Sequence, residues 1–422
     1  MKFEEVCRIY NKEDKYLVLN PTVPSWIITN INGVLLLKFY REDKTFDEIA
    51  GEFLEAAPKF SRITVMNFLQ YAKEERLFDI EDEYTYNVRE LSELCLNITD
   101  ICNLHCTYCI VAQRVENDRY LSIDDYKNLL NQAKAINPNM NILITGGEPL
   151  TSELTLPVAQ YARSIGFVCS MLTNGTLISE KNIDELVSLF SEFQISIDGS
   201  SAEIHDYYRG EGSYERAKHG VDLLISHGAN VKVAVVVTKR NMHDIAKLSE
   251  QWEGRLVIQP LFPFGKSNSD DKLNLTGMDY YETLSKIQSH VPYVGLFPVV
   301  KRERQRKQLP KCGMGDGMLS ISCTGNVYPC NNLHGAKYRL GNLFEQSLED
   351  IYNSPLNNEI KKHTVNSIEK CRVCDFKLIC GGSCQARNFC ESGDLDIASG
   401  FCEYDRTAII NGLIDSAQFR KL

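Results

Sequence analysis

Three cysteines lie close together in the segment Cys102-Asn-Leu-His-Cys106-Thr-Tyr-Cys109, which has the pattern C-x₃-C-x₂-C. Three thiolates on one loop can hold three corners of a cubane iron–sulfur cluster, which leaves the fourth iron open. A zinc ion usually takes four ligands, so a zinc site here would need His105 or a distant residue to complete it. Because an open iron can chelate a small molecule, we expect a cluster and keep zinc as the alternative.

A second group of cysteines occupies the C-terminal quarter of the chain. Its members follow one another in an ordered spacing: Cys312, Cys330, Cys371, Cys374, Cys380, Cys384 and Cys402. Four of them have the pattern C-x₂-C-x₅-C-x₃-C, which would also fit a zinc ribbon, so spacing alone leaves zinc and iron–sulfur open. The chain has 15 cysteines in all. In a reduced compartment, such clustering indicates metal or redox chemistry rather than disulfides.

The composition narrows the function classes. Apolar residues make up 43% of the 422 residues and charged residues 24%, as in soluble globular proteins. The net charge of −10 argues against nucleic acid as the main partner. The charged N-terminus has no apolar signal segment, and no apolar run reaches membrane-spanning length. We therefore expect a cytoplasmic protein that binds neither nucleic acid nor membrane.

Strands and helices alternate in the middle of the chain, which predicts parallel strands with right-handed crossovers. This α/β pattern fits a partial barrel or an open doubly wound sheet, and in both the loops after the strands carry the chemistry. The expected strands are Leu94–Ile98, Asn141–Thr145, Val168–Thr173, Phe193–Ile197, Val231–Thr238 and Leu256–Phe262. The expected helices are Ile123–Ile136, Thr155–Ile165, Ile183–Phe190 and Tyr214–His227.

The turn Gly146-Gly147-Glu148-Pro149 directly follows the second expected strand, one strand after the cysteine triplet. Its glycines permit close backbone approach. With this turn and with Tyr108 before the last cysteine, the segment resembles the radical S-adenosylmethionine (SAM) superfamily. The resemblance implies a partial (β/α)₆ barrel, a 4Fe–4S cluster bound by the triplet, and SAM chelated to its open iron. Reductive cleavage of SAM then yields a 5′-deoxyadenosyl radical that removes a substrate hydrogen.

The resemblance also implies which other residues contact SAM. Tyr108, Gly146, Gly147 and Glu148 belong to the cluster loop and to the turn that meets the SAM amino group. Three further residues match positions that touch its ribose or carboxylate, with ordinary loop capping as the alternative: Asn174, Ser196 and Arg209. Arg209 has the side chain for a bidentate carboxylate contact.

The C-terminal cysteines resemble the SPASM extension of radical SAM enzymes, which carries two auxiliary clusters. The resemblance implies that one cluster is bound by Cys371, Cys374, Cys380 and Cys402, and the other by Cys312, Cys330 and Cys384. No cysteine lies just upstream of Cys312, so either Cys323 is the fourth ligand or one iron is open to a substrate thiolate. Sulfatase-maturing members have a catalytic Asp where this chain has Asn331, so we do not expect formylglycine formation.

The N-terminal part shows a short apolar strand, Lys15–Leu19, followed by three helical patterns. We assign Ile27 to Leu36 to the first helix, Phe46 to Leu54 to the second and Val65 to Ala72 to the third. This winged-helix-like module resembles the peptide-recognition element of ribosomal-peptide maturases. The resemblance implies a precursor peptide with a leader sequence as partner, bound by strand addition. A purely structural winged helix is the alternative.

We therefore predict three domains: a recognition domain (1–88), a radical SAM partial barrel (89–300) and a SPASM domain (301–422). The predicted function is peptide maturation by an intramolecular Cys thioether crosslink, as in the sactipeptide and ranthipeptide type, with a flavodoxin or ferredoxin as electron donor. The alternatives are carbon–carbon or carbon–oxygen crosslinking, epimerisation, and a non-catalytic iron–sulfur or zinc scaffold that binds peptides. No catalytic side chain is assigned.

Overall fold

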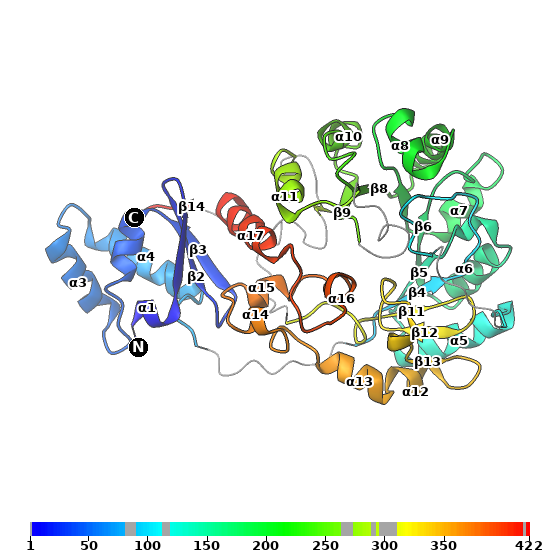
Figure 1. The fold of residues 1–422 in the computed structure, drawn as a ribbon. Helices are drawn as coiled ribbons and strands as arrows, with labels where there is room; N and C mark the ends of the chain where they lie inside the picture. Colours follow the sequence, from blue (N-terminus) through cyan, green and yellow to red (C-terminus); the bar gives the residue numbers. More distant parts are fainter. Residues whose placement is uncertain are drawn as a thin grey trace.

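The computed structural model describes residues 2–80, 90–111, 119–262, 273–287, 293–294, 310–416 and 419–422. Figure 1 shows an N-terminal sheet with its helices at one end and a large α/β sheet at the other. The C-terminal helices α14 to α17 lie between these two parts. The acidic segment that the sequence marks as a linker, Glu81-Asp82-Glu83, lies outside the described residues.

The N-terminal sheet combines both ends of the described chain. Strands β1 (Arg8–Lys12), β2 (Lys15–Asn20) and β3 (Ser25–Thr29) are antiparallel neighbours. The short strand β14 (Phe419–Arg420) pairs in parallel with β3, so the order is β1-β2-β3-β14. Figure 1 shows β14 in red beside the blue strands. The sequence pattern did not reveal this fourth strand.

Three helices cover one face of this sheet: α2 (Ile31–Leu37), α3 (Phe46–Ala56) and α4 (Arg62–Glu74). Each begins after a side-chain N-cap, namely Asn30, Thr45 and Ser61. The three predicted helices are therefore present, but the first prediction is wrong at its start. Ile27 lies in β3, because Asn30 caps the helix only after the strand has ended.

The central sheet contains the six predicted strands, side by side and parallel. They are β4 (Glu93–Asn97), β5 (Asn141–Thr145), β6 (Val168–Thr173), β7 (Glu192–Ser196), β8 (Val231–Val237) and β9 (Leu256–Pro260). Together with the covering helices they form the predicted partial barrel. Because all six run the same way, the loops after β4, β5, β6 and β7 leave from one edge.

Helices pack around this sheet as the pattern predicts. The four expected helices are α5 (Ile123–Ile136), α6 (Thr155–Ser164), α7 (Ile183–Leu189) and α9 (Ser213–Ser226). Two more helices were not predicted, α8 (Ala202–Arg209) and α10 (Ile245–Gln251). Helix α8 matters for the site, because it ends at Arg209.

The C-terminal part extends the same sheet. A hairpin around Thr324-Gly325-Asn326 is formed by β11 (Met318–Ile321) and β12 (Asn326–Tyr328). Beyond the prediction, β11 pairs in parallel with β4, the strand that leads into the cysteine triplet. The remaining strands and α-helices are α1 (Phe3–Val6), β10 (Tyr293–Val294), β13 (Gly341–Asn342), α11 (Gly277–Ser285), α12 (Leu348–Tyr352), α13 (Pro355–Lys362), α14 (Glu369–Arg372), α15 (Lys377–Cys380), α16 (Gln385–Ser392) and α17 (Cys402–Ser416).

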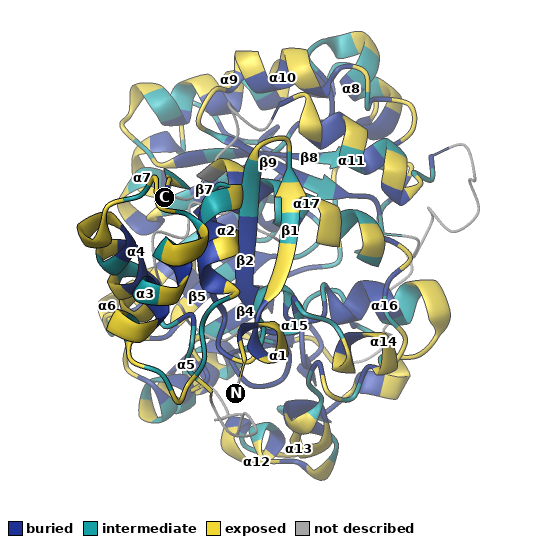
Figure 2. Ribbon diagram, turned by 90° about the vertical axis from the view of Figure 1, so that its left-hand side faces the viewer, coloured by how far each residue is buried: buried dark blue, intermediate teal, exposed yellow. Residues whose placement is uncertain are grey.

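The N-terminal sheet is buried on both faces. Val18 and Ile27 pack with the helices α2 to α4, whereas Leu17, Leu19 and Ile28 pack against the C-terminal part. On that second face the partners include Phe376, Ile409, Leu413 and Ile414. Figure 2 shows β2 as buried and β1 as a largely exposed edge. The sheet therefore joins the N-terminal helices to the C-terminal part.

Candidate active site and cluster-binding cysteines

The cysteine triplet lies on the loop that leaves β4. Burial raises the pKa of Cys106, and the neighbouring charges on its thiol include Cys109 and Cys102. Burial likewise raises the pKa of Cys102, with Cys109 among its neighbours. The backbone N–H of Leu104 donates to the Cys102 Sγ at 3.4 Å. The three thiols therefore lie near one another, and a backbone amide donates a hydrogen bond to one of the sulfurs. Such hydrogen bonds are typical of iron–sulfur ligands.

Within the described ranges, no three His, Cys, Asp or Glu side chains converge closely enough to share one metal ion. A cubane does not need such convergence, because each thiolate binds a different iron atom. His105, the ligand that a zinc site would need nearby, is exposed. The arrangement thus fits a cluster better than a zinc knuckle.

The Gly-Gly-Glu-Pro turn packs directly on the backbone that precedes the triplet. The Gly147 N–H donates to the Thr99 carbonyl at 2.6 Å, and the Glu148 N–H donates to the Ile101 carbonyl at 2.9 Å. A Cβ at Gly146 would lie 2.3 Å from the Thr99 carbonyl oxygen, and one at Gly147 2.3 Å from that of Ile101. Gly146 also has φ +141°. Only glycine allows the two loops to approach so closely.

Glu148 is fully buried, and its carboxylate is satisfied by the chain itself. It accepts hydrogen bonds from the Thr173 hydroxyl (2.6 Å), the Asn174 N–H (2.8 Å) and the Leu150 N–H (3.1 Å). Burial raises the pKa of Glu148, and these hydrogen bonds oppose that rise. Glu148 therefore joins the loop after β5 to the loop after β6.

Asn174 follows β6 and lies against the cluster loop. Its Nδ2 donates to the Asn103 Oδ1 at 2.9 Å and lies 3.9 Å from the Cys102 Sγ. Its Oδ1 accepts from the Thr176 N–H at 2.9 Å. Ser196, the last residue of β7, leaves from the same edge of the sheet and is half-buried. The contacts of both residues with SAM remain predictions.

A buried ion pair lies beside the cluster loop. The Arg209 Nε donates to the Asp198 carboxylate, its Nη2 donates to the Tyr108 hydroxyl at 2.8 Å, and its Nη1 lies 3.9 Å from the Cys106 Sγ. Tyr108 also donates to Asp198. Burial alone would raise the pKa of Asp198, but the charge of Arg209 holds it below its usual range. Arg209 therefore holds a fixed positive charge beside a cysteine sulfur.

Sequence reasoning missed Asp198 as the partner of Arg209. It lies two residues beyond Ser196 in the segment Ile195-Ser196-Ile197-Asp198-Gly199 and accepts the Val236 N–H at 3.0 Å. An acid directly after a parallel strand was the only available signal. Because Asp198 and Tyr108 occupy two of the Arg209 N–H groups, the predicted contact of Arg209 with the SAM carboxylate rests on the remaining groups.

Cys312, Cys330 and Cys384 gather in the C-terminal part. Burial raises the pKa of Cys330 well above normal, and electrostatic repulsion from Cys384 and Cys312 raises it further. Burial also raises the pKa of Cys384 to about 12, with Cys312 as its strongest charged neighbour. Backbone amides point at both sulfurs, from Asn332 to Cys330 and from Ala386 and Arg387 to Cys384.

The second predicted set of cysteines also converges. Burial raises the pKa of Cys371 to about 11, and electrostatic repulsion from Cys402 and Cys374 raises it further. Cys371 in turn acts on Cys380, whose sulfur receives amides from Ser383 and Gly382. The Phe376 N–H donates to the Cys374 Sγ at 3.4 Å. The four thiols thus lie together although α14, α15 and α17 carry three of them.

Cys323 lies in the turn between β11 and β12. Its Sγ donates to the Asp100 Oδ2 at 3.3 Å, on the backbone that precedes the triplet. Asn331, next to Cys330, accepts from the Asn97 side-chain amide at 3.1 Å. Cys323 therefore contacts the loop after β4, and Asn331 accepts a hydrogen bond from a side chain of that strand.

The remaining cysteines have other surroundings. Cys95 and Cys169 are fully buried in β4 and β6, where they pack as small core residues. The Cys7 Sγ donates to the Leu77 carbonyl at 3.5 Å. Cys390 is half-buried in α16, and burial raises its pKa to about 11. None of the 15 cysteines forms a disulfide.

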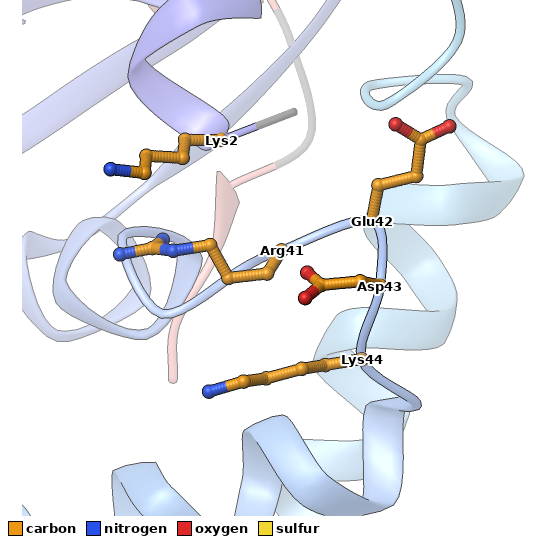
Figure 3. Close-up of a pocket in the computed structure, with 5 residues that line it drawn as sticks. All are labelled: Lys2, Arg41, Glu42, Asp43 and Lys44. Atoms are coloured by element: carbon orange, nitrogen blue, oxygen red, sulfur yellow. The ribbon is translucent and has the colours of Figure 1, made fainter.

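A separate surface hollow lies on the N-terminal unit, lined by Lys2, Arg41, Glu42, Asp43 and Lys44 (Figure 3). Its charges are of both signs, and it contains none of the predicted site residues. In the part of the chain that the structure describes, no helix is long and apolar enough to cross a membrane.

The fold and the three groups of thiols define an iron–sulfur enzyme of the radical SAM/SPASM class, and comparison with known families agrees. Residues 96–251 match the Radical SAM superfamily, and residues 312–375 match the SPASM iron–sulfur cluster-binding domain. The chain thus carries a radical SAM domain and a SPASM domain. Its cofactors are SAM, the 4Fe–4S cluster that binds SAM, and auxiliary iron–sulfur clusters.

The chain is similar in sequence or in fold to proteins with different named activities. It is 27% identical to an AdoMet-dependent heme synthase of Methanosarcina barkeri, over 73% of this chain and 95% of the relative. It is 29% identical to the subtilosin biosynthesis protein AlbA of Bacillus subtilis, over 68% of this chain and 65% of AlbA. Streptococcus suis SuiB, crystallised with S-adenosylmethionine, shares the fold with a TM-score of 0.61 at 16% identity, over 94% of this chain and 99% of SuiB.

Proposed function

We propose that the chain matures a ribosomally made precursor peptide by forming an intramolecular Cys thioether. The carrying observation is that one chain joins a radical SAM site to an N-terminal sheet whose β3 edge accepts an extended segment. Strand addition to such an edge recognises a peptide through its main chain. The proposed domains keep the predicted limits: 1–88 for recognition, 89–300 for the barrel and 301–422 for SPASM.

The comparisons support a peptide substrate. The fold of SuiB matches 94% of this chain, so nearly all of the chain has a counterpart in SuiB. SuiB has been crystallised with the precursor peptide SuiA. AlbA is named for the biosynthesis of a bacteriocin. The heme synthase match favours a second candidate, the modification of a heme precursor. The N-terminal sheet favours the peptide, because a tetrapyrrole offers no main chain for strand pairing.

The residues around the proposed SAM site have different roles. When bound, the cluster and SAM supply a 5′-deoxyadenosyl radical that removes a substrate hydrogen. Gly146 and Gly147 let their turn lie against the cluster loop, and Glu148 holds that turn to the loop after β6. Arg209 holds a positive charge near Cys106, which favours the thiolate form of a ligand.

The two auxiliary sets keep their predicted ligands, and we propose that the Cys312, Cys330 and Cys384 cluster has one open iron. The hydrogen bond from Cys323 to Asp100 supports this proposal, because it directs that thiol to the barrel loop. An open iron would bind the thiolate of the substrate cysteine. Electron paramagnetic resonance of the auxiliary clusters should change on adding a cysteine-containing precursor and not its Ser variant. A Cys323→Ser enzyme should give unchanged spectra before the addition.

The function is tested with the anaerobically reconstituted enzyme, SAM, a reductant and precursor peptides encoded beside its gene. We expect 5′-deoxyadenosine, a product lighter by two hydrogen atoms, and loss of one alkylatable thiol. A lighter product with all thiols intact would indicate carbon–carbon or carbon–oxygen crosslinking, and unchanged mass with deuterium uptake would indicate epimerisation. If a heme precursor is consumed and the peptides are not, the peptide proposal is wrong.

Two further elements belong to the proposal. A chain of 15 cysteines without a disulfide fits a reduced cytoplasm. There a flavodoxin or ferredoxin would supply the electron, and substituting either for a chemical reductant in the same assay tests this partner.

A further inference from the structure

The β3 edge of the N-terminal sheet is already occupied by the chain itself. Phe419 and Arg420 pair with Ile28 and Thr29. The Thr29 hydroxyl donates to the Arg420 carbonyl at 2.7 Å. The side chain of Asn30 donates to the Leu422 carbonyl at 3.2 Å and accepts from its N–H at 3.4 Å. The segment Phe419–Leu422 is therefore held by its main chain, which is how strand addition recognises a peptide.

Two apolar side chains anchor this segment on opposite faces of the sheet. Leu422 is 8% exposed and packs in the core formed with helices α2 to α4. Phe419 packs on the other face, in the cluster that contains Ile28 and Leu413. Lys421 between them is exposed. The segment is thus an extended strand that places one apolar side chain on each face of the sheet.

The opposite edge of the sheet offers no comparable site. Arg8 and Ile9 of β1 are exposed, and Lys12 of the same strand pairs with Asp415 at 2.8 Å. Charged and exposed edge strands disfavour further pairing. The β3 edge, with its apolar places on both faces, is therefore the edge suited to a peptide.

The pairing of this segment is short compared with the rest of the sheet. Two residue pairs join β14 to β3, whereas five join β2 to β3. Only residues 417 and 418 separate β14 from α17, which packs against the same sheet. So short a connection gives the segment a local concentration in the millimolar range or above, so few bonds suffice to hold it. A short strand kept in place by its tether can be exchanged for another strand.

We propose that Phe419–Leu422 is an internal competitor that fills the peptide-binding edge until a precursor displaces it. The proposal rests on the proposed function, in which the N-terminal module binds the precursor. It adds that the recognised peptide segment is extended and carries apolar side chains three positions apart, as Phe419 and Leu422 do. A permanent structural strand is the opposing interpretation, and the two differ in whether the edge can be refilled from solution.

The test uses a fluorescein-labelled peptide with the sequence of residues 413–422 and fluorescence polarisation. The enzyme variant carries Phe419→Gly, Arg420→Ser, Lys421→Gly and Leu422→Ser, which keeps the chain length. We expect saturable binding to this variant and at least about tenfold weaker binding to the unchanged enzyme, whose edge is filled. A Lys421→Ala enzyme is the matched control and should stay closed, since Lys421 is exposed. A peptide with Leu422→Asp should not bind either enzyme.

The outcomes separate this proposal from the proposed function. If the variant folds, by circular dichroism and iron content, and does not bind the peptide, the internal competitor is wrong whatever the precursor assay shows. Equal binding to the variant and to the unchanged enzyme also overturns it. If the variant binds the peptide but precursors are neither bound nor modified, the β3 edge is confirmed as a peptide-binding edge and the proposed function is wrong. Should the full replacement not fold, Leu422→Ala alone gives the same readout, because it removes only the buried anchor.

Discussion

The loops at the carboxyl edge of the barrel and the β3 edge of the N-terminal sheet are built in opposite ways. At the barrel edge, Glu148 accepts three hydrogen bonds, Arg209 contacts two polar partners and a cysteine sulfur, and both side chains are buried. At the sheet edge, two residue pairs and the side chains of Thr29 and Asn30 hold a segment that contains an exposed lysine and a buried leucine.

The difference separates a site that must not move from one that must exchange its occupant. Radical chemistry needs its groups held in one geometry, and a buried network in which each member has partners supplies that. Recognition of a peptide needs an edge that can open, and few bonds suffice there. The following predictions test whether the barrel edge is as rigid as its contacts indicate.

Cys106→Ala should have the largest effect, because it removes one of three proposed thiolates of the SAM-binding cluster. We expect 5′-deoxyadenosine formation to fall to background in anaerobic assays with SAM and reductant. Cys169→Ala is the control, since Cys169 is a buried residue of β6, and it should keep both iron content and turnover. If Cys106→Ala turned over at the unchanged rate, the cysteine triplet would not be required for SAM cleavage.

Gly147→Ala should lower the rate of 5′-deoxyadenosine formation by about 100-fold, because its Cβ must push the turn away from the cluster loop. Gly51→Ala in α3 is the matched control, since apart from its chain neighbours and its own helix backbone no atom lies within 4 Å of its Cβ position. That variant should keep the rate and gain about 0.5–1 kcal/mol in helix stability. Similar rates for both variants would show that the loops can separate freely.

Arg209→Met leaves the Asp198 carboxylate buried without its counter-charge. We expect the free energy of unfolding in urea to fall by about 3–5 kcal/mol. Lys218→Met breaks an exposed pair with Asp222 and should cost no more than about 0.5 kcal/mol. If both substitutions cost the same, the buried pair contributes less than its geometry indicates.

Lowering the pH should weaken the barrel through His205, which is fully buried. Burial lowers the pKa of His205 from 6.5 to about 4, so the folded protein keeps this imidazole neutral. Below pH 6.5 the unfolded chain binds the proton and the folded chain does not, so stability falls with pH. Between pH 7 and pH 5 the loss should be about 2 kcal/mol.

The measurement for His205 is urea unfolding at both pH values, compared with His205→Asn. Asparagine can still accept the hydrogen bond that the Asp198 N–H gives to the His205 Nδ1 at 3.2 Å. The variant should lose about 2 kcal/mol of the pH dependence. An unchanged pH dependence would mean that other groups cause it.

Much of the barrel edge could be predicted because its signals are local. The strands β5 and β6 have the predicted limits, since apolar runs bounded by turn residues mark them. The N-terminal limit of α2 was missed, because the apolar spacing of Ile27 fits a helix as well as a strand. Asp198 was missed as well, because nothing in a sequence states which buried arginine meets which acid.

The sequence by itself determined the chemistry: the spacing of Cys102, Cys106 and Cys109 and the glycines of the turn that packs against them. These features act between neighbours in the chain or between adjacent strands, so they leave a pattern. Only the tertiary structure decided that Arg209 meets Asp198, that Cys323 turns to Asp100, and that β14 completes the N-terminal sheet. A strand of two residues shows no periodicity, and its pairing with β3 spans nearly the whole chain.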